Sequence, residues 1–172
     1  PTPSIRLLSW VITLLIPLVL IGGAVRLLVT DQYLAYEYAK ADFPPDPFGF
    51  TAAQRLTYAS ANFRYVREAE PLAALADQQL GGRPLYNARE LKHMQDVQDV
   101  YQATWVVWRI SLVVLIIAGL ALAWHPQTRT ALTVAVKRGG LLAAGLVAAV
   151  GLLAVVAWRL WFTAFHRIFF AA

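Results

Sequence analysis

The sequence predicts a mainly α-helical protein, a polytopic membrane helix bundle with three spans and an extracytoplasmic insert between spans one and two. Two observations predict this class. The chain is 59% hydrophobic with a mean hydropathy of +0.54, and its apolar residues are concentrated in three long blocks. In addition, all ten acidic residues lie between Asp31 and Asp99, in the one long stretch that is not apolar.

The basic residues predict the orientation of the spans. The loop between the second and third apolar blocks contains Arg129, Lys137 and Arg138 and no acid, and the N-terminal segment contributes Arg6. Because short loops rich in Lys and Arg stay in the cytoplasm, we expect this loop and the N-terminus to be cytoplasmic. The region 30–102 is then extracytoplasmic. The net charge of +5 is not a sign of nucleic-acid binding here, because the basic surplus lies at the ends of apolar segments, where membrane proteins carry Lys and Arg. We therefore expect no nucleic-acid partner.

The first span is expected within residues 1–29, which are long enough to cross a bilayer core. Pro17 and the pair Gly22-Gly23 interrupt it, and a membrane helix tolerates a kink at such residues. Arg26 lies near its end and can extend its charge to the interface. A cleaved signal peptide is the alternative, since small residues follow the apolar run. We favour an uncleaved anchor, because apolar residues resume before residue 30.

The second span is expected over residues 103–124, with Trp105 near one end and Trp124 at the other, as in the aromatic belts of membrane proteins. A cytoplasmic loop over 125–139 follows. The third span and its outer end are expected over 140–172.

Small residues recur at helical spacing in the third span: Gly140, Ala144 and Ala148 form one row, and Gly145 and Ala149 the next. Such a row allows another helix to approach closely. The alternative is that alanine and glycine simply fill the span.

The extracytoplasmic region contains two signals for helix starts. Thr51 followed by Gln54 has the pattern of a capping box, and Asn87 with Glu90 has the same arrangement. From Ala88 onward no helix breaker occurs before the end of the second span. We therefore predict one helix of about 35 residues, about 50 Å long, whose first turns stand outside the membrane.

The first turns of this long helix contain a candidate site. Glu90, His93 and Asp96 fall on one helical face, because residues three and four apart are neighbours. A carboxylate one turn from a histidine can orient the ring and stabilise the imidazolium, as a general base requires. The alternative is an ordinary polar face on the outer turns of a helix.

A second histidine, His166, lies in the aromatic stretch WFTAFHRIFF at the outer end of the third span. The predicted topology brings it to the same membrane surface as His93. Two histidines there could form an acid/base pair for acyl chemistry, or could bind a metal or a haem. The alternative is an interfacial histidine in an aromatic belt. His125 lies on the cytoplasmic side and is interpreted as an interface residue.

Other catalytic signals are absent from the sequence. It has no Gly-rich phosphate loop, no G-x-S-x-G and no H-E-x-x-H motif. The chain has no cysteine, so it has no thiolate nucleophile, thiolate metal site or disulfide. Tyr33, Tyr36, Tyr38 and Tyr58 could line a substrate cleft or lie at the membrane surface.

These motifs resemble those of the lipoprotein intramolecular transacylases, a family of bacterial integral membrane proteins. The resemblance rests on RELKHMQDV with YNA before it, on YEYAK, on FTAAQRL and on FHRIFF, in this order along the chain. It implies a four-helix membrane domain in the bacterial cytoplasmic (inner) membrane. The family pattern continues past FHRIFF, so we expect either a fourth helix beyond residue 172 or its loss, with a partner subunit completing the site.

The resemblance implies a membrane acyltransferase that moves the sn-2 acyl chain of a diacylglyceryl-modified lipoprotein to its N-terminal amine, which forms the lyso-lipoprotein. By motif, two catalytic histidines of the family match His93 and His166. In the hypothesis that follows, His93 acts as base, and His166 stabilises or protonates the other oxygen. The supporting residues are Glu90 and Asp96 for ring orientation, Arg55, Arg89 and Arg167 for oxyanion or headgroup contacts, and Tyr86. The expected partners are the lipoprotein and membrane lipid, and no cofactor is implied.

Two other functions remain open at this stage. The chain could be a non-catalytic accessory subunit of a larger membrane complex with other membrane subunits, which the small-residue row favours. It could also be a bis-histidine haem or metal subunit of an electron-transfer complex.

Overall fold

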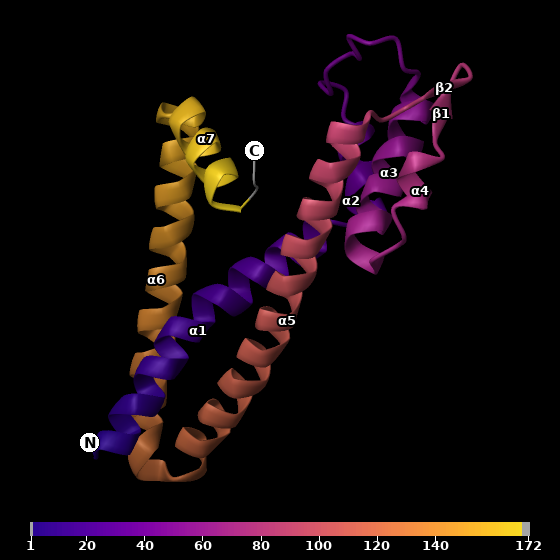
Figure 1. Cartoon of the computed structure of the whole chain (residues 1–172). Helices are drawn as coiled ribbons and strands as arrows, with labels where there is room; N and C mark the ends of the chain where they lie inside the picture. Colours follow the sequence, from indigo (N-terminus) through magenta and orange to yellow (C-terminus); the bar gives the residue numbers. More distant parts are fainter. Residues whose placement is uncertain (1, 170–172) are drawn as a thin grey trace. The chain divides into compact units, whose positions relative to one another are not determined.

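The computed structural model describes residues 2–169, most of which are helical. Within these residues, three helices are long and apolar enough to cross a membrane (Figure 1): α1 (Pro3–Leu28), α5 (Ala88–Trp124) and α6 (Arg129–Val156). The 3-10 turn η1 (Pro126–Thr128) precedes α6. The predicted class, mainly α-helical with three span-length helices, is confirmed.

The chain divides into two compact units. The long-helix unit comprises Pro1–Gly23 and Trp105–Ala172, and the insert unit comprises Ala24–Thr104. Helices α1 and α5 each contribute residues to both units. Each unit has its own buried residues, and each is described by itself below.

The insert unit contains short elements between α1 and α5. They are α2 (Asp31–Tyr38), α3 (Ala52–Glu68), α4 (Ala73–Ala76), β1 (Gln79–Leu80) and β2 (Arg83–Pro84). The two strands form an antiparallel hairpin in which Gln79 lies opposite Pro84. Gly81 and Gly82 form its turn with positive φ angles, a backbone conformation that glycine adopts without steric cost.

Both predicted helix starts of the insert unit are confirmed. The backbone N–H of Gln54 donates to Thr51 Oγ1 (3.2 Å), and the backbone N–H of Thr51 donates to Gln54 Oε1 (2.9 Å). At the start of α5, the backbone N–H of Glu90 donates to Asn87 Oδ1 (3.0 Å), and that of Asn87 donates to Glu90 Oε2 (2.8 Å). Helix α5 then continues for 37 residues, so the predicted single long helix is also confirmed.

One face of α5 packs against α3 and α4. Tyr65, Val66 and Leu75 are buried there, and the apolar residues around them are Leu72, Tyr86, Leu91, Met94, Val97 and Tyr101. On the same face, the Gln98 amide donates to the carbonyls of Tyr65 (2.6 Å) and Glu70 (2.9 Å). This packing fixes which side of α5 remains for other contacts.

In the long-helix unit, α1 packs closely against α6 at Gly139. A Cβ at Gly139 would lie 2.8 Å from Ile16 and 3.0 Å from the Thr13 carbonyl, and Thr13 Oγ1 donates to the Ala135 carbonyl (3.2 Å). The row through Gly140, which the sequence offers for a close approach of another helix, does not face α1. The contacting row lies one residue earlier, because the rotation of α6 about its axis turns Gly140 toward open space.

Helix α1 is continuous through Pro17 and the two glycines. Gly22 allows the side chain of Trp108 to pack on α1, where the indole Nε1–H donates to the Val19 carbonyl (2.9 Å). The glycines thus serve the contact between α1 and α5.

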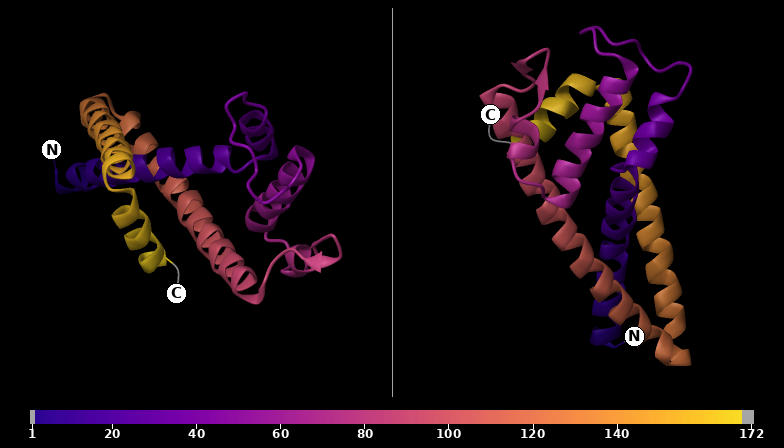
Figure 2. Two further views of the ribbon diagram at one scale, coloured as in Figure 1. Left: turned by 90° about the horizontal axis from the view of Figure 1, so that it is seen from above. Right: turned by 90° about the vertical axis from the view of Figure 1, so that its right-hand side faces the viewer.

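The third apolar segment differs from its expected bounds of 140–172. Helix α6 begins at Arg129, within the expected loop 125–139, and ends at Val156. After a non-helical residue, Ala157, a separate helix α7 (Trp158–Phe169) turns away from the axis of α6 (Figures 1 and 2). The expected outer end of the span is therefore a second helix, and residues 170–172 of that prediction lie outside the described part of the chain.

Candidate functional site

The exposed side of α5 carries the first predicted site. Four polar side chains of α5 lie outside the face that packs against α3: Arg89, Lys92, His93 and Asp96. The last three follow Arg89 by three, four and seven residues, so all four share one helical face. Arg89 and His93 are exposed, whereas Asp96 is half-buried. Helix α5 therefore presents an imidazole with two basic side chains and one carboxylate on its uncovered side.

Asp96 and Glu90, the two acidic residues near His93, make their described contacts with groups other than the His93 ring. Asp96 Oδ1 accepts from Lys92 Nζ (2.8 Å), and this hydrogen bond raises the pKa of Lys92. Glu90 caps the N-terminus of α5 through the backbone N–H of Asn87. Orientation of the His93 ring by either carboxylate stays a prediction.

Tyr86 fixes the chain just before α5. Its hydroxyl donates to Asn62 Oδ1 (3.2 Å) and accepts from Asn62 Nδ2 (2.9 Å). Burial raises the pKa of Tyr86, and the nearby Glu90 charge raises it further, so the phenol is neutral at physiological pH. Sequence reasoning missed Asn62, because a single asparagine inside a helix gives no signal of a distant partner. The contact ties α3 to the start of the helix that carries His93.

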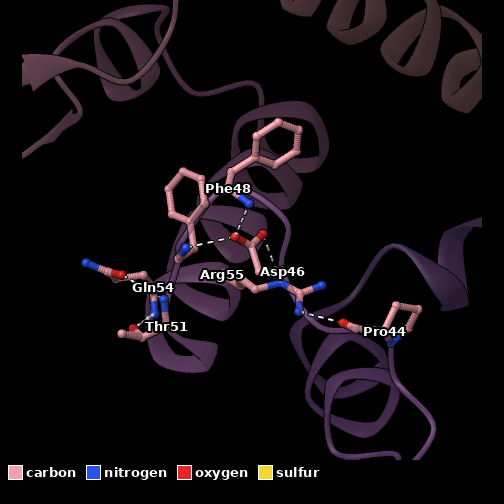
Figure 3. A network of polar contacts seen from close by, with 7 residues as sticks. Pro44, Asp46, Phe48, Thr51, Gln54 and Arg55 are labelled. Carbon is pink, nitrogen blue, oxygen red and sulfur yellow. Dashed lines mark hydrogen bonds and ion pairs between the residues drawn. The ribbon is translucent and has the colours of Figure 1, made fainter.

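Arg55 organises the loop between α2 and α3 (Figure 3). Its Nη1 donates to the Pro44 carbonyl (2.9 Å), and its Nε lies 3.8 Å from Asp46 Oδ1. Asp46 Oδ2 accepts from the backbone N–H groups of Phe48 and Phe50, both at 2.8 Å. These contacts support a structural role for Arg55, and its predicted oxyanion contact stays a prediction.

The ring of His166 is held by its own helix. His166 Nδ1 lies 2.9 Å from the Phe162 carbonyl, and its ring centroid lies 3.8 Å from that of Phe162. Since a carbonyl oxygen can only accept a hydrogen bond, Nδ1 carries the proton in the neutral ring. In this tautomer Nε2 is the nitrogen that can take up a proton. Arg167, the next residue, is exposed.

The two histidines belong to different units, His93 to the insert unit and His166 to the long-helix unit. Their convergence on one site therefore stays a prediction. Within residues 2–169, no group of three or more His, Asp or Glu side chains is arranged to hold a metal ion.

Comparison with known proteins gives a match over nearly the whole chain. The family described as lipoprotein intramolecular transacylase Lit matches residues 10–172. A protein of Aquifex aeolicus (strain VF5), described as an uncharacterized protein, is 26% identical over 94 residues, which are 54% of this chain and 44% of that protein. The matched part thus spans less than half the length of that relative. No solved structure matches the chain significantly.

Proposed function

Since this chain belongs to the lipoprotein intramolecular transacylase family, we propose that it moves an acyl chain within a diacylglyceryl-modified lipoprotein to the N-terminal amine, forming a lyso-lipoprotein. The observation that carries this proposal is the family match over residues 10–172, which includes both His93 and His166. The substrate is a lipid-anchored protein, and three span-length helices support a reaction at a membrane.

The proposed location is the bacterial cytoplasmic membrane, with the N-terminus in the cytoplasm and residues 30–102 outside. The basic residues of the two expected cytoplasmic segments, which are Arg6, Arg129, Lys137 and Arg138, support this orientation. A lipoprotein anchored in the outer leaflet would then present its modified N-terminus to the side of the insert unit.

In the proposed reaction, the N-terminal amine attacks the carbonyl carbon of the sn-2 ester. A general base takes a proton from the attacking nitrogen, and a tetrahedral intermediate forms. The bond from carbon to the sn-2 oxygen then breaks, a proton passes to that oxygen, and an amide and a free glyceryl hydroxyl result. Each histidine needs one nitrogen for proton transfer and one for orientation.

The described contacts favour His166 as the base, which reverses the roles in the sequence-based hypothesis. The contact of His166 Nδ1 with the Phe162 carbonyl supports the tautomer in which Nε2 would accept the proton. His93, beside Arg89 and Lys92, would stabilise the developing oxyanion or protonate the leaving oxygen. Arg89 lies one helical turn before His93 and Arg167 directly follows His166, and both arginines are exposed.

The test is acyl transfer to a lipoprotein co-expressed with single-residue variants of the full chain. We expect His93→Ala and His166→Ala each to reduce formation of the lyso-lipoprotein by about a hundredfold or more, the usual size of a general acid or base contribution. Mass spectrometry of the N-terminal lipopeptide distinguishes an acyl chain on the amine from one on the glyceryl oxygen.

His125→Ala is the matched control, because this histidine is expected on the cytoplasmic side, and it should retain activity. A His93→Ala or His166→Ala protein that reaches the membrane in normal amount and transfers acyl chains at the normal rate would contradict the assignment. A wild-type chain that leaves the lipoprotein unchanged would instead support the accessory subunit. Visible absorbance of the purified protein would support the haem subunit.

A further inference from the structure

Helix α7 has a sharply divided surface. Successive residues of a helix are about 100° apart, so Arg159, Thr163, His166 and Arg167 share one arc of about 100°. The rest of the circumference carries only apolar and aromatic residues, which are Trp158, Leu160, Trp161, Phe162, Ala164, Phe165, Ile168 and Phe169. No acidic residue follows Asp99 in the sequence, so the polar arc is purely basic and neutral.

Much of the apolar face of α7 is exposed in the described part of the chain. Leu160 is 73% exposed and Ile168 75%, and Trp158 is 53% exposed. The aromatic side chains on this face contact one another along the helix, as Trp158 with Trp161 (5.5 Å between ring centroids) and Trp161 with Phe165 (5.6 Å). They form a continuous aromatic ridge along α7.

The bilayer is the partner that fits this surface. Helix α6 has the length and composition of a membrane span, and it ends at Val156. Helix α7 starts two residues later. It therefore starts near the place where that span leaves the hydrocarbon core. Aromatic residues prefer this interfacial depth, and the two arginines complement lipid phosphates.

We propose that α7 lies flat in the bilayer surface, with its aromatic ridge in the acyl-chain boundary and with Arg159 and Arg167 bound to lipid phosphates. This inference goes beyond the proposed activity and holds whether or not the protein is an enzyme. It places His166 on the arc that faces the headgroups.

Depth measurements on the full chain in vesicles test the orientation. Because the chain has no cysteine, single-cysteine variants carry a unique nitroxide label. In vesicles of phosphatidylcholine and phosphatidylglycerol, labels at Leu160, Ala164 and Ile168 should all lie about 5–10 Å below the surface, with high accessibility to oxygen. A label at Thr163 should be accessible to a water-soluble nickel reagent.

Two results would overturn this proposal. If α7 continued the span, the depth would change by about 12 Å between residues 160 and 168, at 1.5 Å per residue. If the ridge were covered by protein, the labels on the apolar face would be protected from both oxygen and nickel.

A charge-matched pair of variants tests the contact with phosphate. The double variant Arg159→Gln/Arg167→Gln should shift the Ile168 label toward water. Lys137→Gln/Arg138→Gln, which removes the same charge from exposed positions on α6, should leave its depth unchanged. An unchanged depth in the first variant, or an equal shift in both, would contradict the binding of phosphate by the two arginines.

Discussion

At the scale of single residues, hydrogen-bond partners decide what the candidate side chains can do. The Phe162 carbonyl selects the Nδ1–H tautomer of His166, and this makes Nε2 the basic nitrogen. The Asn62 amide satisfies both the donor and the acceptor of the Tyr86 hydroxyl. Tyr86 therefore serves to hold α5 in place, since its hydroxyl is already engaged within the insert unit.

This role makes Tyr86→Phe a structural variant. It leaves the Asn62 amide without its two contacts to the hydroxyl, and a half-buried amide that loses its partner costs about 1–3 kcal/mol. We expect a lower thermal midpoint in detergent, followed by circular dichroism. Tyr36→Phe is the matched control, because Tyr36 is 66% exposed, and it should melt like the wild type. Equal midpoints for both variants would show that the contact contributes nothing.

The same burial predicts an alkaline loss of stability. Burial raises the pKa values of Tyr65 and Tyr86 above the ordinary value of about 10. The folded protein then holds these protons more tightly than the unfolded chain, so stability is full below about pH 10 and falls as the pH rises through the folded pKa values. Thermal midpoints measured between pH 8 and 11 should fall only above about pH 10. Tyr86→Phe should reduce the fall, and a midpoint that rises with pH would contradict the sign.

At the scale of helices, close packing depends on which small residues face a neighbour. Gly139 lies against Ile16 and the Thr13 carbonyl, whereas nothing lies within 4 Å of a Cβ built at Gly140. Two adjacent glycines of α6 thus have opposite surroundings. The spacing of small residues identifies rows that can pack closely, but the rotation of the helix decides which row does.

The glycine pair gives a matched test of this packing. Gly139→Ala places a methyl group 2.8 Å from Ile16 and should cost about 1–3 kcal/mol, the usual effect of overpacking. Gly140→Ala places the same methyl group in open space and should be neutral. Thermal unfolding of both variants in one detergent gives the comparison. Equal destabilisation, or a larger loss for Gly140→Ala, would contradict the observed contact row.

At the scale of the whole molecule, the chain has two units with separate cores, and each carries one candidate histidine. Long helices α1 and α5 contribute to both units, so the insert unit is connected to two of the three span-length helices. The proposed reaction requires His93 and His166 to reach the same substrate. A short distance between these two histidines is therefore the decisive geometric requirement of the proposed reaction.

Cross-linking measures this proximity directly, because a chain without cysteine gives no background. The variant His93→Cys/His166→Cys should cross-link within the chain when treated in membranes with a short bis-maleimide. Mobility on gels after cleavage between the two sites detects the link. His93→Cys/His125→Cys is the control, since its two thiols are expected on opposite membrane sides, and it should not cross-link. Failure of the first pair and success of the second would exclude a shared site.

Local features of the sequence determined the long helices of this protein, two of its helix starts and its family. Span-length helices follow from the length of the apolar runs, and the starts of α3 and α5 follow from Thr51 with Gln54 and Asn87 with Glu90. The HM-x-DV and FH-x-x-FF motifs also determined the family, which the match over residues 10–172 confirms. These signals lie within a few residues of the feature that they predict.

Only the tertiary structure decided the partners that are distant in sequence. Gly139 lies against Ile16, and Tyr86 binds Asn62, because folding brings these segments together and no spacing in the chain encodes it. The same is true of Arg55, whose guanidinium binds the loop at Pro44. The sequence also did not predict the break at Ala157. The aromatic residues of α7 continue the apolar run of α6, although the backbone changes direction at Ala157. The hydrophobicity of a segment is the sum over its residues and can be obtained from the sequence. The direction of a helix and the contact partners of its residues depend on the three-dimensional path of the chain.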